Sequence, residues 1–307
     1  MKRFIIRIGL FFVLLLAFDR VIGYALQYMS DNARGGYLGH QNYILKECKD
    51  DILIFGSSRA IHHYNAPMIQ DSLKVSCYNC GQDGEGIIMY YGWWQLIKQN
   101  YSPKVIIYEV FPPYDVEKGD NAKHLGWLKL IYDNKGIQQE FEDIDPKEKY
   151  KMLSLMYRYN SRFHQILLDY IHPVHSINRG YLPVYKELDT LQIRRDGAEE
   201  TGDYKEIEMD TLKFKYLERI LTELDDTKMV FILSPTWYGK NEQDLTSLRN
   251  LAMHNNCDFY DFTTDSSFVH HSDFFYDGYH LNSKGADKYT QKVVELLRSI
   301  VSNNSLE

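Results

Sequence analysis

Cysteine is scarce in this chain, and the few that it contains do not form a disulfide framework. They are Cys48, Cys77, Cys80 and Cys257 among 307 residues, too sparse a set for a small fold held together by disulfides. Cys77 and Cys80 have the spacing of a redox or zinc motif, but no second CxxC pair and no nearby His-x-x-x-His segment completes a zinc site. We expect ordinary buried thiols or one local disulfide, and a thiol redox protein is the least favoured class.

An excess of positive charge is also absent. The chain carries 35 Lys and Arg against 42 Asp and Glu, a formal net charge of -7. A surface that binds nucleic acid gains affinity from Lys and Arg contacts with phosphates, so we expect no nucleic-acid partner. His62-His63 and His270-His271 do not complete a ligand set, and we predict neither a metal nor a cofactor. Tyrosine, by contrast, is abundant at 25 residues, which suits contacts with sugar rings but also fits a simple bias in amino-acid usage.

The N-terminal segment lacks an uninterrupted apolar run of membrane-spanning length. Its uncharged stretch extends from Ile8 to Phe18, whereas a spanning helix needs about 20 apolar residues. Basic residues precede the stretch, Asp19 and Arg20 interrupt it, and no small-x-small cleavage site follows. A basic start before an apolar stretch is typical of a secretory signal. The sequence therefore predicts an uncleaved signal-anchor over 1–26, with a cleaved signal as the alternative, and places the rest of the chain outside the membrane, in the periplasm of a bacterium.

Short apolar runs alternate with helical patterns after residue 50. Five runs have the composition of buried strands: 51–55, 74–78, 104–110, 228–233 and 257–260. Helical patterns fall between them, and an amphipathic helix is expected from about 284 to 301. Near-continuous apolar strands that alternate with helices indicate a parallel, five-stranded sheet covered on both faces. The prediction is an α/β domain over 51–301, preceded by a linker over 27–50, with its ligand site beyond the carboxyl ends of the strands.

One stretch interrupts this alternation. Residues 121–210 contain helical patterns at 123–132 and 147–171, whereas 186–209 is highly charged and resembles a solvated surface. We interpret 121–210 as a helical insertion that forms a cap over the site. The chain contains no internal repeat and no low-complexity tract.

Ser58 directly follows the first predicted strand, in the segment Phe55-Gly-Ser-Ser58. A serine at the start of a helix lies among free backbone N–H groups and at the positive end of the helix dipole. Such donors can stabilise the oxyanion that forms when a serine attacks an ester carbonyl. Alone the signal is weak, because Gly-Ser-Ser turns are also common helix caps.

The segment Asp277-Gly-Tyr-His280 supplies partners for this serine. A histidine can take the serine proton and return it to the leaving group. A carboxylate on the other ring nitrogen fixes the tautomer and stabilises the imidazolium. Ser58, Asp277 and His280 therefore predict a catalytic triad. The competing interpretation is a surface aspartate and a structural histidine.

Three residues near these strand ends are candidates for substrate binding. Arg59 follows Ser58 on the same predicted helix, and Trp237 and Tyr238 follow the fourth strand. The two aromatic rings can stack on a sugar, and packing against the protein is an equally good explanation.

These segments together resemble the SGNH/GDSL hydrolase family. Ser58 matches the nucleophile, with Ser57 in place of the usual Asp of Gly-Asp-Ser, and Gly84 matches the glycine whose N–H joins the oxyanion hole. The block from Asp277 to His280 matches the Asp-x-x-His motif. The resemblance covers residues 50–301, and it implies a flavodoxin-like three-layer α/β/α sandwich that hydrolyses or transfers acyl groups.

One block of the family is missing. The third block supplies an Asn donor to the oxyanion hole, and here the segment Glu109-Val-Phe-Pro-Pro-Tyr-Asp115 takes its place without an Asn. Pro113 has no N–H, and Tyr114 offers only a phenol. Loss of one oxyanion donor typically costs about 10²–10³ in rate. We expect an oxyanion hole made by the N–H groups of Ser58 and Gly84, with Tyr114 as its weakest member, or else a slow or degenerate site.

The N-terminal segment fits a subset of this family that is anchored outside the membrane and modifies envelope polysaccharides. Examples are the alginate and peptidoglycan O-acetylation proteins and the D-alanylation protein of teichoic acids. The resemblance implies an esterase or O-acyltransferase for acyl esters, chiefly acetyl esters, of a glycan, attached to the membrane through its N-terminal helix. Transfer would add a polytopic membrane acyltransferase as partner. The alternative is a non-catalytic carbohydrate-binding or assembly protein that keeps the fold. The missing Asn favours this alternative, and the three intact triad residues argue against it.

Overall fold

The computed structural model describes residues 1–172, 178–188, 208–239 and 245–303. The chain divides into two compact units, each made of two separate segments. The helical unit comprises Met1–Glu47 and Asp120–His175, and the α/β unit comprises Cys48–Gly119 and Ser176–Glu307.

The α/β unit is built on a parallel sheet of five strands. They are β1 (Ile52–Gly56), β2 (Cys77–Asn79), β3 (Val105–Glu109), β4 (Lys228–Leu233) and β5 (Asp258–Asp261). Their order in the sheet is β2-β1-β3-β4-β5, and every neighbouring pair is parallel. This is the flavodoxin-like order, in which the carboxyl ends of the strands form the usual site of a ligand. The predicted α/β class and its parallel five-stranded sheet are confirmed.

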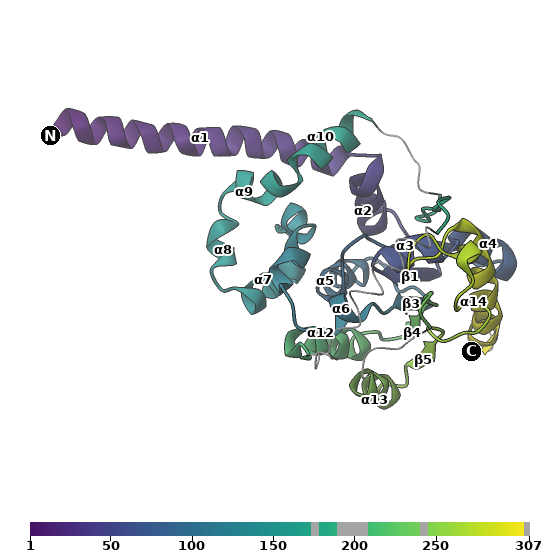
Figure 1. Ribbon diagram of the computed structural model, residues 1–307. Helices are drawn as coiled ribbons and strands as arrows, with labels where there is room; N and C mark the ends of the chain where they lie inside the picture. Colours follow the sequence, from purple (N-terminus) through teal and green to yellow (C-terminus); the bar gives the residue numbers. More distant parts are fainter. Residues whose placement is uncertain (173–177, 189–207, 240–244, 304–307) are drawn as a thin grey trace. The chain divides into compact units, whose positions relative to one another are not determined.

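Helices cover both faces of the sheet (Figure 1). The helices of this unit are α3 (Ser58–His63), α4 (Ala66–Leu73), α5 (Ile87–Ile97), α6 (Pro112–Asp115), α12 (Thr211–Thr222), α13 (Thr246–His254), η5 (Ser272–Phe274) and α14 (Ser283–Asn303). Successive side chains of a strand point to opposite faces. Ile54 therefore joins the core beside α4 and α14, and the next residue, Phe55, stacks on Tyr90 of α5 on the other face, with ring centroids 5.0 Å apart. The result is the expected three-layer sandwich.

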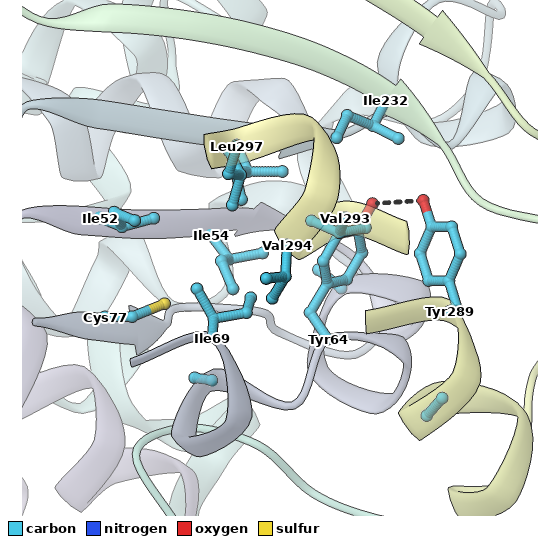
Figure 2. Packing of buried hydrophobic residues seen from close by; sticks show 14 of the residues in the cluster. Ile52, Ile54, Tyr64, Ile69, Cys77, Ile232, Tyr289, Val293, Val294 and Leu297 are labelled. Carbon is cyan, nitrogen blue, oxygen red and sulfur yellow. Dashed lines mark hydrogen bonds between the residues drawn. The ribbon is translucent and has the colours of Figure 1, made fainter. Parts of the chain in front are cut away.

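The core between the sheet and α14 is shown in Figure 2. Ile52 and Ile54 of β1 lie among Ile69 of α4 and the apolar side of α14, and all of them are almost fully buried. Burial of one such side chain contributes roughly 1.5–3 kcal/mol. Two tyrosines bring hydroxyls into this apolar layer: the oxygens of Tyr64 and Tyr289 lie 3.2 Å apart.

All four cysteines are buried and unbridged. Burial raises the pKa of the Cys48 thiol to about 12, a change that the hydrogen bond with Tyr101 only partly offsets. Burial likewise raises the pKa of Cys257 to about 12. Reactive thiols need a lowered pKa, so these groups are packed side chains. This agrees with the expectation of ordinary buried thiols. The local disulfide that was the other expectation is not formed.

The helical unit combines the N-terminal segment with most of the predicted insertion. Its elements are α1 (Lys2–Asn32), α2 (Gly36–Lys46), η1 (Asn121–Leu125), η2 (Leu128–Ile131), η3 (Lys135–Ile137), α7 (Gln138–Ile144), α8 (Glu148–Lys151), α9 (Leu155–Tyr159), η4 (Asn160–Arg162) and α10 (Phe163–Ile171). Asp19 of α1 joins the two segments. Its carboxylate accepts hydrogen bonds from the Ser154 hydroxyl (2.5 Å) and from the N–H groups of Leu155 and Met156 (3.1 Å each) at the start of α9.

The predicted signal-anchor over residues 1–26 is wrong. Among the residues that the structure describes, no helix combines the length and the apolar character that a membrane crossing requires. α1 has 31 residues, but Arg7, Asp19 and Arg20 interrupt its apolar sequence. The predicted membrane-anchored location is corrected accordingly.

Two other boundaries differ from the sequence-based expectation. Residues 27–50 were expected to form a linker, but most of them belong to α1 and α2. The insertion is not one body, because 120–175 belongs to the helical unit whereas 178–188 packs in the α/β unit, with Tyr181 in its core. Most of the charged stretch 186–209 lies outside the described residues. The idea that the insertion caps the site stays a prediction.

Candidate active site

Ser58 is the first residue of α3, directly after β1. The turn between them depends on Gly56, whose φ of 135° is rarely adopted by residues with a side chain. A Cβ at Gly56 would also collide with the backbone of Glu109 on β3. The turn places the Ser58 hydroxyl oxygen 2.7 Å from Nε2 of His280.

Asp277 holds the other side of the His280 ring. Its Oδ1 and Oδ2 lie 3.0 and 2.9 Å from Nδ1 of His280. Oδ1 also accepts the N–H groups of Tyr279 and His280, at 2.8 Å each. A carboxylate only accepts, so Nδ1 carries the proton and Nε2 is free to accept the hydroxyl hydrogen of Ser58. This is the tautomer that a general base requires.

The electrostatics of this loop keep Asp277 ionised. Burial by itself would raise the pKa of Asp277, but the hydrogen bond and charge of His280 and the two backbone N–H donors together lower it below the usual value. The ring of Tyr276 stacks on the His280 ring, with centroids 5.3 Å apart and planes 15° apart. The structure thus brings together the three residues that the sequence singled out, although Asp277 follows Ser58 by 219 positions in the chain.

Gly84 lies in the loop after β2, and the two residues before it contact the turn that precedes α3 and His62 near the end of α3. The N–H of Gln82 donates to the carbonyl of Gly56 at 3.1 Å, and Asp83 lies 3.3 Å from His62 of α3. Gly84 has a φ of 75°, and a Cβ there would meet nothing within 4 Å. Its backbone conformation, rather than crowding, therefore favours glycine. The N–H of Ser58, at the first helical position, has no acceptor within its own helix, and the oxyanion role of both N–H groups stays a prediction.

Tyr114 is held in α6 by its neighbours. Its ring packs edge-on against Phe111, with centroids 4.9 Å apart. Its backbone lies against Gly86, where a Cβ would collide with the Tyr114 carbonyl. These contacts place Tyr114 next to the loop that carries Gly84. A role for its phenol as an oxyanion donor stays a prediction.

Arg59 was expected to bind substrate, and the structure gives its side chain a different place. Arg59 is only 3% exposed. Its Nη2 lies 2.8 Å from Oε1 of Glu109 and donates to the carbonyl of Val110 at 2.5 Å. The guanidinium also covers the Phe111 ring, 5.1 Å from its centroid. Because this side chain points into the interior and is already paired, we correct its assignment from substrate binding to structural support.

Trp237 and Tyr238 lie beside the loop of the base. The N–H of Trp237 donates to the carbonyl of Gly278 at 2.9 Å. The Tyr238 ring occupies the space that a side chain at Gly278 would need, and it packs against Tyr279 with centroids 5.3 Å apart. Both aromatic residues are half-buried. Packing against the loop accounts for their position, and stacking on a sugar stays a prediction.

His62 lies between two hydrogen-bond acceptors, a surrounding that the sequence did not indicate. Nδ1 of His62 lies 2.7 Å from the Leu182 carbonyl, and Nε2 lies 3.3 Å from Oδ1 of Asp83. Both partners are acceptors, so a doubly protonated ring satisfies both. Burial alone would lower the pKa of His62, but Asp83, the Leu182 carbonyl and Asp277 raise it above the usual value. Two adjacent histidines just after Ser58 were the only signal in the sequence.

Among the described residues, no group of three or more His, Cys, Asp or Glu side chains could hold a metal ion. No protein-family model and no curated protein matches the chain.

Proposed function

We propose that this protein is an SGNH-type serine esterase or O-acyltransferase that acts on acyl esters, chiefly acetyl esters, of a glycan. The observation that supports it most is the unbroken hydrogen-bonded series from the Ser58 hydroxyl through His280 to Asp277, at 2.7 and 2.9 Å. This series has the order and the tautomer of a serine nucleophile with its base and orienting carboxylate.

The proposed reaction has two steps. In the first, Ser58 Oγ attacks the acyl carbonyl carbon while its proton moves to Nε2 of His280. The ester C–O bond then breaks, His280 gives this proton to the leaving sugar oxygen, and the acyl group remains on Ser58. In the second step, water or a sugar hydroxyl attacks the acyl-serine carbonyl carbon and loses its proton to His280. The bond between the acyl carbon and Ser58 Oγ then breaks, His280 returns the proton to Ser58 Oγ, and the acid or the acylated sugar is released. Water gives hydrolysis, and a sugar hydroxyl gives transfer.

Charge on the carbonyl oxygen needs hydrogen-bond donors in both steps. The N–H groups of Ser58 and Gly84 fill this role in our proposal, with Tyr114 as a weaker third donor. With no Asn in the segment after β3, we expect turnover about 10²–10³ below that of an enzyme with a full set of donors.

The second candidate is a non-catalytic carbohydrate-binding or assembly protein, which the missing Asn favours. A binding protein does not require a serine hydroxyl within hydrogen-bonding distance of a histidine that a carboxylate orients. The measured spacing of Ser58 and His280 therefore supports the enzyme over the binder.

The test is hydrolysis of a small acetyl ester together with covalent labelling by a serine-directed fluorophosphonate. We expect Ser58→Ala to abolish both signals, because it removes the nucleophile. Ser57→Ala is the matched control. Ser57 is adjacent and fully buried, and its hydroxyl has no hydrogen-bond partner among the described residues, so both signals should persist. Wild-type protein that neither turns over the ester nor reacts with the probe would contradict the proposal and favour the binder.

A further inference from the structure

We propose that His63 is a positioning residue for His280, acting through a buried hydrogen-bonded relay that connects the helix of the nucleophile with the loop of the base. This inference rests on the proposed function. The relay consists of Arg59, Glu109, Ser234, His63 and the backbone N–H of Leu281. Its two ends are the sequence neighbours of Ser58 and His280.

His63 contacts the loop of the base directly. Its Nε2 lies 2.9 Å from the N–H of Leu281, and its Nδ1 lies 2.8 Å from the hydroxyl of Ser234. A backbone N–H can only donate, so Nε2 is the acceptor and Nδ1 carries the proton. His63 is therefore a neutral ring that donates to Ser234. The His280 ring lies edge-on to it, with centroids 6.0 Å apart.

Ser234 connects His63 to Glu109 by accepting one hydrogen bond and donating two. With its oxygen accepting from His63, its hydroxyl donates to Oε1 of Glu109 at 2.7 Å, and its backbone N–H donates to the same oxygen at 3.0 Å. The carboxylate of Glu109 is paired with Arg59 at 2.8 Å and accepts the hydroxyl of Tyr64. Tyr64 extends the network to Tyr289 of α14, as Figure 2 shows.

The relay admits only one arrangement of protons, and this makes it a rigid support. His63, Ser234 and Glu109 are all fully buried, so water cannot replace a lost partner, and an unsatisfied buried group costs roughly 1–3 kcal/mol. Burial, together with the positive charge of Arg59, lowers the pKa of His63 well below its usual value, in agreement with a neutral ring. The N–H of Leu281 is thus held at a fixed point relative to α3, and the distance from Ser58 to His280 is fixed with it.

Two substitutions separate the contact with Leu281 from the contact with Ser234. In His63→Gln the longer side chain can place its amide oxygen near the position of Nε2 and still accept from Leu281. In His63→Asn the amide reaches only the position of Nδ1, so the N–H of Leu281 loses its acceptor. We expect His63→Asn to lower kcat for a small acetyl ester by about 10²-fold, since a displacement of about 1 Å can cost this much, with KM little changed. His63→Gln should recover at least about tenfold of that loss.

The readouts distinguish positioning from stability. Each kcat is referred to folded protein, measured well below its Tm, and fluorophosphonate labelling rates should follow the same order. Equal kcat values for the two variants, or a kcat of His63→Asn at the wild-type level, would overturn the inference while the proposed function stands. Loss of activity in the wild type would instead overturn the proposed function. If neither variant folds, Ser234→Ala is the deciding variant, because it removes the acceptor of the Nδ1 proton of His63. It should lower kcat about tenfold, and a kcat at the wild-type level would refute the relay.

Discussion

Asp277 holds His280 in one tautomer, and the hydrogen bonds around its two oxygens predict what an amide would do there. Oδ1 receives the N–H groups of Tyr279 and His280, so the carbonyl oxygen of Asn in Asp277→Asn must occupy that position. The NH₂ group then faces Nδ1 of His280, which has to become an acceptor. The ring proton moves to Nε2, where it opposes the Ser58 hydroxyl, and the base is lost.

We therefore expect Asp277→Asn to lower kcat by about 10⁴-fold with a Tm close to that of the wild type, because the loop keeps its backbone hydrogen bonds. Steady-state kinetics on a small acetyl ester and a thermal melt measure both quantities. A kcat within tenfold of the wild type would show that His280 does not act as the base in this tautomer. Asp277→Ala is the control, since it cannot reverse the tautomer and should lose less activity than the amide if the ring stays in place.

At the scale of single residues, the sequence identifies those that belong to a motif. It does not identify residues whose role depends on whether the side chain points into the protein or toward solvent. Ser58, Asp277 and His280 could be found because their spacing matches a strand end and a final loop. Arg59 and His63 lie on the same short helix as Ser58, and either could face solvent. The packing of α3 against β3 and α14 turns both side chains inward, and those contacts join segments that are remote in the sequence.

At the scale of elements, one carboxylate fixes the starts of two helices. Asp115 of α6 accepts from the N–H of Ile87 at 2.8 Å, from the N–H of Phe111 at 2.6 Å and from the hydroxyl of Tyr108 at 2.6 Å. Ile87 begins α5, so α5 and α6 share this anchor. Burial raises the pKa of Asp115 to about 6, although these hydrogen bonds oppose the change.

This raised pKa predicts how stability depends on pH. In the unfolded chain the pKa of an aspartate is about 4, so between about pH 4 and pH 6 the folded state binds more protons than the unfolded state, and the stabilisation from this group declines as the pH rises through that window. We expect Asp115→Asn to destabilise the protein both near pH 5 and near pH 7, because its NH₂ opposes the N–H of Phe111. The deficit relative to the wild type should be larger near pH 5 than near pH 7, by about 1 kcal/mol. Urea denaturation at both pH values measures it, and an equal or smaller deficit near pH 5 would contradict the assignment.

Strands and long helices could be predicted from the sequence to within a few residues. The run 104–110 contains β3, and the helix expected at 284–301 is α14, because an apolar strand or an amphipathic stripe is a local property. The helices expected at 123–132 and 147–171 are instead short α and 3₁₀ pieces. Gly126 falls inside the stretch 123–132, where a continuous helix would need a helix former. In the stretch 147–171, a new helix begins after Ser154, whose hydroxyl caps α9 and bonds to Asp19.

At the scale of the whole molecule, each unit joins segments far apart in the chain. In the helical unit Asp19 bonds to the start of α9, and the N–H of Leu38 donates to Asp169 of α10 at 3.0 Å. These pairs are more than 130 residues apart, and no periodicity or turn signal reports such a contact. For this reason the sequence separated 1–26, 27–50 and 121–210 into an anchor, a linker and an insertion, whereas the structure combines most of these residues into one unit.

The last prediction concerns the free part of α1. Every residue from Met1 to Phe18 is exposed, and this segment carries a dense set of large apolar side chains that are at least 41% exposed. Exposed apolar surface of this extent promotes association, so the full chain should self-associate in aqueous buffer. Removal of residues 2–18 retains Asp19 and its bonds to α9, and touches no residue of the proposed site. We expect the shortened chain to be monodisperse by light scattering, with an unchanged kcat/KM for a small acetyl ester.

The control, Asp19→Ala in the full chain, should keep the association and lower the Tm, because it leaves the start of α9 without its acceptor at a cost of roughly 1–3 kcal/mol. Equal self-association of the full and shortened chains would show that another surface drives it, and a loss of activity on shortening would show that the exposed half of α1 supports the site.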